Sequence, residues 1–116
     1  MQTLGTAVVV AVLAATGAAP GPSGLRGLVT KGPITPVCVQ GIPCTAPAAG
    51  VRLTFRRPGL VRTTLTGRDG RYRILLASGR YSVTLSPGRF GYGPRVVAVP
   101  AGRVGVVNFQ LDTGIR

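Results

Sequence analysis

Apolar and polar residues alternate along short segments of this chain, and turn residues separate those segments at short intervals. Residues 51–57, VRLTFRR, show the pattern most clearly, because Val51, Leu53 and Phe55 fall on one face and polar residues on the other. Side chains of a strand point alternately to the two faces of a sheet, so this spacing predicts a half-buried strand. The 18 Gly and 10 Pro residues supply turns and break helices. The sequence therefore predicts an all-β fold.

The same alternation predicts seven strands, over residues 23–30, 51–57, 60–66, 71–77, 80–86, 95–100 and 103–112. The residues that it directs inward are Leu25, Gly27, Val29, Val51, Leu53, Phe55, Tyr72, Ile74, Leu76, Tyr81, Val83 and Leu85. In residues 60–66, Val61 and Leu65 share one face, and Arg62 and Thr64 share the other. The dipeptide Asp69-Gly70 favours a tight turn, which predicts a hairpin between the third and fourth strands. Seven short strands without a helix predict one antiparallel Greek-key β-sandwich.

The N-terminus carries an apolar run without charge, GTAVVVAVLAATGAA, over residues 5–19. Such a run is too short to span a bilayer comfortably, but it matches the apolar region of a secretory signal peptide. We therefore predict a signal peptide over residues 1–18, a linker over residues 19–23 and the sandwich domain over residues 24–116. The residues before the run lack the Lys or Arg that usually opens a signal, and the alternative is that the run is a buried strand or helix of the domain itself. We favour the signal peptide and therefore predict that the protein is secreted or extracytoplasmic, at the cell envelope.

The two cysteines, Cys38 and Cys44, lie in a loop segment rich in Pro and Gly. In an exported protein, a disulfide is the default state of such a pair. Two free thiols would need a reducing compartment and apolar surroundings. A closed metal site would need further ligands, and the chain has no His. The sequence thus predicts a Cys38–Cys44 disulfide that rigidifies a long loop, with neither metal nor cofactor.

A longer motif in the centre of the chain resembles a known family. Residues 66–72 read T-x-x-D-G-x-Y, an apolar strand follows, and residues 79–83 read G-x-Y-x-V. This pattern is similar to that of carboxypeptidase regulatory-like domains, part of the wider prealbumin-like group that includes collagen-adhesin B-type repeats, and the similarity covers roughly residues 24 to 112. The resemblance implies a seven-stranded prealbumin-like sandwich, usually exported, that serves as a binding, spacing or stabilising module. It implies a fold and leaves the ligand open.

The chain has few residues of the types that catalyse reactions. The absence of His excludes the usual Ser-His-Asp and Cys-His arrangements. The two acids are Asp69, which the turn explains, and Asp112, which ends the last predicted strand. No glycine-rich phosphate loop follows a strand and opens a helix. We therefore predict that the chain is not an enzyme but a binding or structural module at the cell envelope or outside the cell.

The balance of charge is strongly basic, with 14 Lys and Arg against 2 Asp and Glu and a net charge of +12. Such a charge favours anionic partners. Paired in a simple hairpin, Arg62, Arg71 and Arg73 would meet on one outer face, which makes them a candidate anion-binding site. The predicted partner is an anionic envelope polymer or another extracytoplasmic protein, and a membrane surface also fits. Solvated arginines, or a codon bias towards Arg, explain the same charge.

An alternative function is nucleic-acid or anionic-polymer binding through the arginine-rich surface. Arg flanks aromatic residues repeatedly, but within strands the aromatic side chains face the core and the neighbouring arginines face solvent, which disfavours nucleic acid. Phe90 and Tyr92 differ because they lie in a Gly- and Pro-rich loop. They either pack over the end of the sandwich or are presented to a ligand, and both interpretations stay open.

Overall fold

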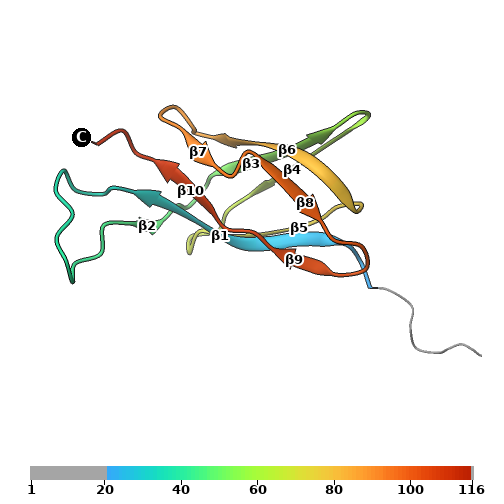
Figure 1. Ribbon diagram of the computed structural model, residues 1–116, viewed down its shortest axis with the longest axis horizontal. Helices are drawn as coiled ribbons and strands as arrows, with labels where there is room; N and C mark the ends of the chain where they lie inside the picture. Colours follow the sequence, from blue (N-terminus) through green and yellow to red (C-terminus); the bar gives the residue numbers. More distant parts are fainter. Residues whose placement is uncertain (1–20, 116) are drawn as a thin grey trace, which may run out of the picture.

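The computed structural model describes residues 21–115, which form ten β-strands and no helix (Figure 1). The strands are β1 (Gly24–Gly32), β2 (Ala46–Pro47), β3 (Arg52–Arg57), β4 (Leu60–Leu65), β5 (Arg71–Leu75), β6 (Gly79–Ser86), β7 (Tyr92–Gly93), β8 (Val96–Val99), β9 (Val104–Val106) and β10 (Phe109–Asp112). The predicted all-β sandwich is confirmed. The additional strands are the two-residue β2 and β7, and the predicted strand over residues 103–112 is divided into β9 and β10. The predicted signal peptide, residues 1–18, lies outside the described residues.

Two sheets face each other in the sandwich. One has the order β4-β3-β6-β8, with antiparallel neighbours throughout. The other is built around β1, which pairs antiparallel with β5 and β2 and parallel with β9 and β10, while β7 pairs with β10. The parallel pairs depart from the antiparallel arrangement expected for every strand. Because β1 reaches the whole length of its sheet, it joins both ends of the sandwich.

The Asp69-Gly70 turn does not close a hairpin, so the predicted pairing of the third and fourth strands is wrong. β4 pairs with β3, whereas β5 pairs with β1 in the opposite sheet. The turn is closed locally, since Gly67 N donates to the Arg71 carbonyl over 2.9 Å and Gly70 N donates to the Gly67 carbonyl over 3.0 Å. The chain therefore turns a corner between the sheets, and the backbone of β5 is free to pair with β1.

The core fills the space between the inner faces of the two sheets. Three aromatic rings lie at its centre, with centroids of Phe55 and Phe109 each within 6.4 Å of one another and of the Tyr72 ring. The buried apolar residues are Leu25, Val29, Ala48, Val51, Leu53, Phe55, Tyr72, Leu76, Tyr81, Val83, Leu85, Val97, Val99, Phe109 and Leu111. Most of the inward residues that the sequence predicts are in this set. Since the set runs from Leu25 to Leu111, a chain that begins at Gly21 contains the whole of the described fold.

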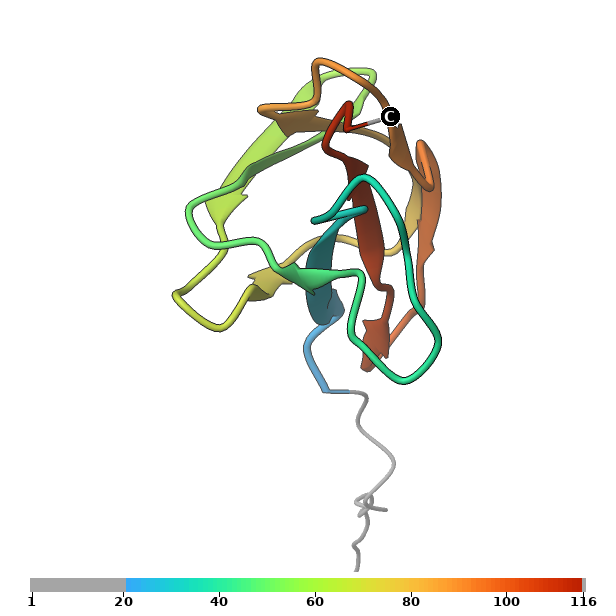
Figure 2. The same ribbon diagram turned by 90° about the vertical axis from the view of Figure 1, so that its left-hand side faces the viewer.

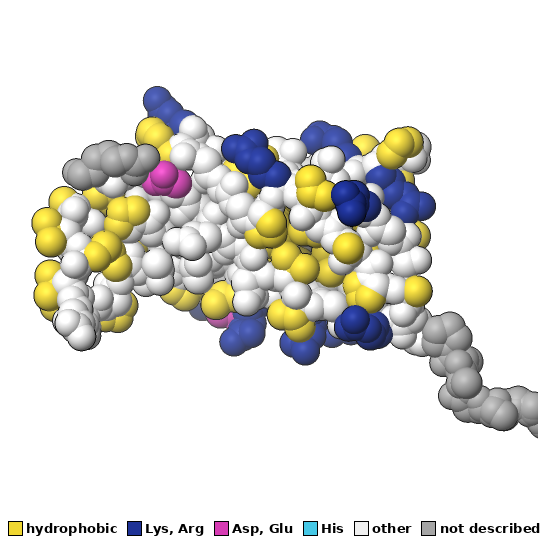
Figure 3. All heavy atoms as spheres, in the orientation of Figure 1, with side chains coloured by type: hydrophobic (Ala, Val, Ile, Leu, Met, Phe, Trp, Pro, Cys, Tyr) yellow, Lys and Arg dark blue, Asp and Glu magenta, His cyan; other side chains and the backbone are white. Residues whose placement is uncertain are grey.

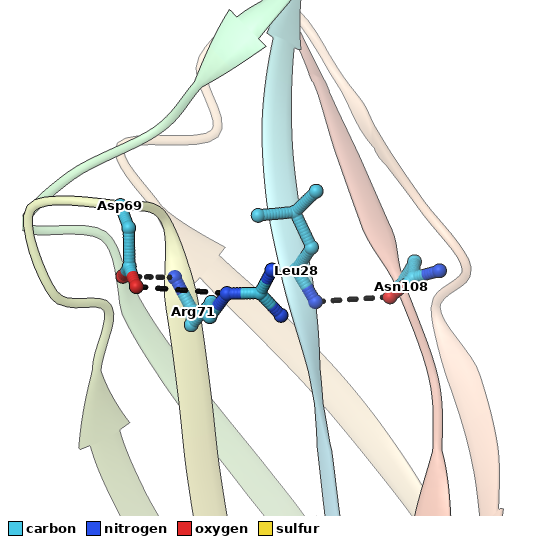
Figure 4. A network of polar contacts seen from close by, with 4 residues as sticks. All are labelled: Leu28, Asp69, Arg71 and Asn108. Carbon is cyan, nitrogen blue, oxygen red and sulfur yellow. Dashed lines mark hydrogen bonds and ion pairs between the residues drawn. The ribbon is translucent and has the colours of Figure 1, made fainter.

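The division between β9 and β10 has a local cause at Gly27. A Cβ atom at this position would collide with the Val107 carbonyl oxygen, so β1 and the segment opposite approach more closely than side chains permit. Val107 N donates to the Arg26 carbonyl over 2.9 Å. Two residues further along β1, Leu28 N donates to the side-chain Oδ1 of Asn108 over 2.9 Å (Figure 4). The Asn108 side chain thus replaces a backbone acceptor where the ladder is interrupted.

Candidate binding surfaces

The residues of the T-x-x-D-G-x-Y motif are occupied in holding the fold together. Thr66 is buried, and its Oγ1 donates to the Ala48 carbonyl over 2.6 Å and accepts from Val51 N over 2.9 Å. The Asp69 carboxylate accepts from Arg71 N over 3.0 Å, which closes the turn. Gly70 adopts a φ of 80°, a conformation that favours glycine. Each of these three residues therefore has a structural role in the fold.

The two motif tyrosines also have structural hydrogen bonds. Tyr72 OH donates to the Val107 carbonyl over 2.7 Å, and Tyr81 OH donates to the Ala77 carbonyl over 2.7 Å. Burial raises the pKa of the Tyr72 phenol well above its ordinary value. Both rings belong to the core, as the alternation predicted. The candidates for binding are therefore the surfaces that the motif leaves free.

The first candidate surface is a cluster of three exposed arginines, Arg26, Arg71 and Arg73, which we call the arginine face. Arg26 of β1 lies directly opposite Arg73 of β5, and Arg71 lies two residues further along the same face of β5. The three side chains line an open hollow of about 610 Å³ that also includes Thr64 and Asn108. Like charges placed opposite each other destabilise a sheet slightly, so an anion bound here would remove a repulsion.

The ion pair that reaches this face is a weak one. The Arg71 guanidinium lies 3.6 Å from the Asp69 carboxylate, and both side chains are largely exposed (Figure 4). It is the sole ion pair found within residues 21–115. One carboxylate stands against three guanidinium groups, so Asp69 neutralises the arginine face only in part, and an exposed ion pair of this kind contributes little to stability.

The composition of this cluster differs from the prediction. The predicted trio relied on the hairpin that does not form, so Arg62 is not a cross-strand neighbour of Arg71 or Arg73. Arg62 lies on β4 opposite Phe55 and lines a separate hollow beside Leu75. Arg26 takes its place in the cluster. Arg26 is recognised as a member of the cluster only from the register of β1 on β5, which pairs segments far apart in the sequence.

The second candidate surface is the end of the sandwich that carries residues 33–45, which we call the disulfide loop. The predicted Cys38–Cys44 disulfide is confirmed, with the two Cα atoms 5.5 Å apart. Ile34 N donates to the Cys44 carbonyl over 2.8 Å, so a backbone hydrogen bond closes the base of the loop and the disulfide closes its centre. Its apolar side chains nevertheless face solvent, with exposed fractions of 71% for Val37 and 62% for Ile42.

Phe90 and Tyr92 lie at the same end and behave differently. Tyr92 is half-buried against the core, its OH donates to the Val83 carbonyl over 3.2 Å, and the Arg95 guanidinium lies 4.6 Å from its ring centroid. Phe90 is about half exposed. Both residues line an open hollow of about 750 Å³ together with the two cysteines. The disulfide loop and the loop that carries Phe90 and Tyr92, which are separate in the sequence, thus form one surface.

Within residues 21–115, no cluster of three or more acidic, Cys or His residues is suited to a metal. The same residues include no apolar helix long enough to cross a bilayer. A disulfide in a domain of this size is typical of proteins outside the cytoplasm.

The two-layer arrangement around a central β1 defines the chain as a prealbumin-like sandwich. Comparison with protein families narrows this class, because the family described as the carboxypeptidase regulatory-like domain matches residues 40–112. The chain belongs to this family, as the central motif predicted. The match begins after β1, the strand that organises one sheet. A search of the curated proteins finds no match to the chain. The family is a family of non-catalytic domains, which suggests a module without an active site.

Proposed function

We propose that this chain is an exported, non-enzymatic module that binds an anionic polymer of the cell envelope through the arginine face. The observation that carries the proposal is the direct opposition of Arg26 and Arg73 on neighbouring strands, with Arg71 on the same face. Neighbouring strands lie about 4.8 Å apart, so the three guanidinium groups can act together on one ligand. An exposed site of this kind suits an extended, flexible polyanion.

The chemistry of the site favours phosphate or carboxylate groups. Guanidinium groups form paired hydrogen bonds with these anions, and a planar fork recognises them better than an ammonium group does. Thr64 and Asn108, at the margin of the hollow, add side chains able to hydrogen-bond the polymer backbone. The chain as a whole carries +12, which attracts a polyanion from a distance and makes the association sensitive to salt.

Binding is tested by sedimentation of the purified, oxidised protein with cell-wall sacculi, with and without their anionic polymers, over a series of salt concentrations. We expect retention that is lost when the polymer is removed and when the salt concentration is raised. The variant Arg26→Gln/Arg73→Gln should bind at least about tenfold more weakly, since it removes two charge-assisted contacts.

The matched control is Arg52→Gln/Arg80→Gln, which removes the same charge from the outer face of the other sheet. It should reduce retention by less than about threefold, the effect of net charge alone. Equal losses in the two variants would show that binding follows net charge and not the arginine face.

Export has a separate test. Mass spectrometry of the protein recovered outside the cytoplasm should give an N-terminus at Ala19 and an oxidised Cys38–Cys44 pair. A nucleic-acid-binding protein of the cytosol would have neither, so an uncleaved and reduced protein would reject the envelope proposal.

A further inference from the structure

We propose that the disulfide loop and Phe90 form a tip that docks on an anionic lipid bilayer, with the apolar side chains inserted among the lipids and a set of basic residues at the headgroups. This surface is separate from the arginine face, so the inference does not depend on polymer binding. Four observations lead to it: the composition of the loop, its exposure, its rigid support and the charges behind it.

The disulfide loop differs sharply in composition from the rest of the chain. Residues 33–45, PITPVCVQGIPCT, contain no charged side chain, although the chain has 14 basic residues. Four of its aliphatic residues are exposed, and Phe90 is exposed beside them. The exposed fractions are 37% for Ile34, 71% for Val37, 53% for Val39, 62% for Ile42 and 51% for Phe90. Exposed apolar groups gathered at one place are typical of a surface that contacts a partner or a membrane.

The apolar side chains gather at one extremity of the molecule. On the face drawn in Figure 3, hydrophobic and uncharged side chains make up most of the described left-hand end, and Lys and Arg side chains begin further back. The disulfide loop is the segment that extends furthest at this end, opposite the end at which residue 21 enters the fold (Figures 1 and 2). A projecting tip of this shape suits insertion into a deformable interface better than it suits a flat rigid surface.

A disulfide and several hydrogen bonds hold the disulfide loop in a shape that keeps its apolar side chains exposed to solvent. The disulfide closes its centre, and the Cys44 carbonyl accepts from Ile34 N. Its base is tied to the C-terminal segment, since Thr113 N donates to the Gly32 carbonyl over 3.1 Å. Thr35 Oγ1 donates to the Val37 carbonyl over 2.8 Å. A preorganised loop loses less conformational entropy when it inserts, which favours binding.

Three basic residues lie close to the tip in the chain, and we call them the basic collar: Lys31 near the end of β1, Arg89 next to Phe90, and Arg95 between β7 and β8. Lys31 is exposed and pairs with Ala46 at the base of the disulfide loop. The guanidinium groups of Arg89 and Arg95 lie 5.4 Å and 4.6 Å from the ring centroids of Phe90 and Tyr92. Apolar residues that insert, followed by aromatic and basic residues at headgroup level, are the arrangement that binds anionic interfaces.

The positive charge of the basic collar favours an anionic bilayer over a second copy of the chain as the partner of the apolar tip. A second copy of the chain would bring two basic collars together, each on a protein of net charge +12, and their repulsion opposes that contact. The acid at this end, Asp112, is half-buried, and its Oδ1 accepts from Gly114 N over 2.8 Å, so it offers little compensation. An anionic bilayer complements both the apolar tip and the collar.

Vesicle flotation with the oxidised chain 21–116, which contains the whole described fold, tests the proposal. We expect the protein to float with vesicles of phosphatidylcholine and phosphatidylglycerol, and not with vesicles of phosphatidylcholine alone. The variant Val37→Ser/Ile42→Ser should bind at least about tenfold more weakly, because two aliphatic side chains no longer enter the interface. The matched control is Val61→Ser/Leu65→Ser, which removes two aliphatic residues from β4 that are also more than half exposed, and it should bind as the wild type does.

A second measurement reads insertion directly. The chain has no Trp, so Phe90→Trp introduces a single fluorescent reporter at the tip. Its emission should shift to the blue with anionic vesicles, and an aqueous quencher should lose access to it. Absence of flotation, or an unshifted emission during flotation, would reject the docking proposal.

Other outcomes reject it in favour of a named alternative. Equal binding by the tip and control variants would mean that net charge alone holds the protein at the vesicle. A dimer in sedimentation that Val37→Ser/Ile42→Ser disrupts would identify a second copy as the occupant. Arg26→Gln/Arg73→Gln, which should lose retention on sacculi, should keep most of its vesicle binding, so the two proposals fail separately.

Discussion

Replacement of Thr66 by Val gives the sharpest test of the part played by the family motif. Tyrosines apart, Thr66 is the one polar residue buried among residues 21–115, at 6% exposure. Its hydroxyl group joins two backbone groups of the segment that leads into β3, the Ala48 carbonyl and Val51 N. Thr66→Val keeps the shape of the side chain but removes the donor and the acceptor together. Ala48 and Val51 are themselves buried, so water does not readily replace the lost partner.

The expected loss of stability follows from the two buried backbone groups that lose their partner, the Ala48 carbonyl and Val51 N. Each unsatisfied buried backbone group costs about 1 to 3 kcal/mol, and partial relaxation of a surface loop lowers that sum. We therefore expect Thr66→Val to reduce the free energy of unfolding by about 3 kcal/mol. Thr66→Ser keeps the hydroxyl group and loses one methyl group, which costs about 1 kcal/mol. Urea unfolding of the oxidised chain 21–116 measures both variants under the same conditions.

The comparison between the two variants decides the argument. If the hydroxyl group stabilises the fold as described, Thr66→Val is less stable than Thr66→Ser by about 2 kcal/mol. Equal stability of the two variants within about 0.5 kcal/mol would refute the reasoning, since it would mean that the Val51 amide and the Ala48 carbonyl find other partners.

Three further predictions concern the motif and the disulfide. Gly70→Ala should lower the free energy of unfolding by at least about 2 kcal/mol, because a Cβ atom would lie 2.6 Å from the Val29 carbonyl oxygen at a φ of 80°; a loss below about 0.5 kcal/mol would contradict this. Removal of the disulfide by Cys38→Ser/Cys44→Ser should cost about 2 kcal/mol in thermal or urea unfolding, as expected for a short closed loop, and an unchanged midpoint would contradict the entropic account. Burial raises the pKa of Tyr72 in the folded state, so its contribution to stability is complete below the unfolded pKa of about 10 and is lost as the pH rises above it. Unfolding of Tyr72→Phe should therefore depend less steeply on pH above 10 than unfolding of the wild type, and identical slopes would contradict the shift.

The strands of the sandwich were predictable because their periodicity is a local property. Val51, Leu53 and Phe55 alternate with polar residues, and no other element is needed to decide which face they bury. The same holds for Tyr81, whose strand β6 alternates buried and exposed residues along most of its length. Burial in a two-layer sandwich repeats with a period of two, so a pattern read from the sequence carries directly into the fold.

Strand pairing was harder to predict because it depends on segments far apart in the chain. Asp69-Gly70 favours a tight turn, and the turn is present, but the turn alone does not decide whether the strands that follow it pair with each other. The partner of β5 is β1, more than forty positions earlier in the sequence. The close approach at Gly27, which divides the last predicted strand, is likewise visible only when β1 is placed beside Val107.

These two limits explain why the family could be predicted and the composition of the arginine face could not. The motif residues Thr66, Gly70 and Tyr72 each make a backbone hydrogen bond that the sandwich requires. The motif therefore predicts the fold and carries no information about the ligand. Residues on the outer faces satisfy no such requirement. Whether they form a site depends on which strands pair, and the exchange of Arg62 for Arg26 is a direct result of one pairing.

The same reasoning predicts where binding function can vary within such a fold. Loops at the end of a sandwich and outward side chains of its strands change without disturbing the core. In this chain, the disulfide loop is closed by its own cross-link and hydrogen bonds, and the arginine face projects from strands whose opposite side carries the core. Substitutions of exposed side chains at either surface, the two cysteines apart, should therefore alter binding while leaving the free energy of unfolding within about 0.5 kcal/mol of the wild type. That separation is what allows the polymer and vesicle experiments to report on recognition and not on folding.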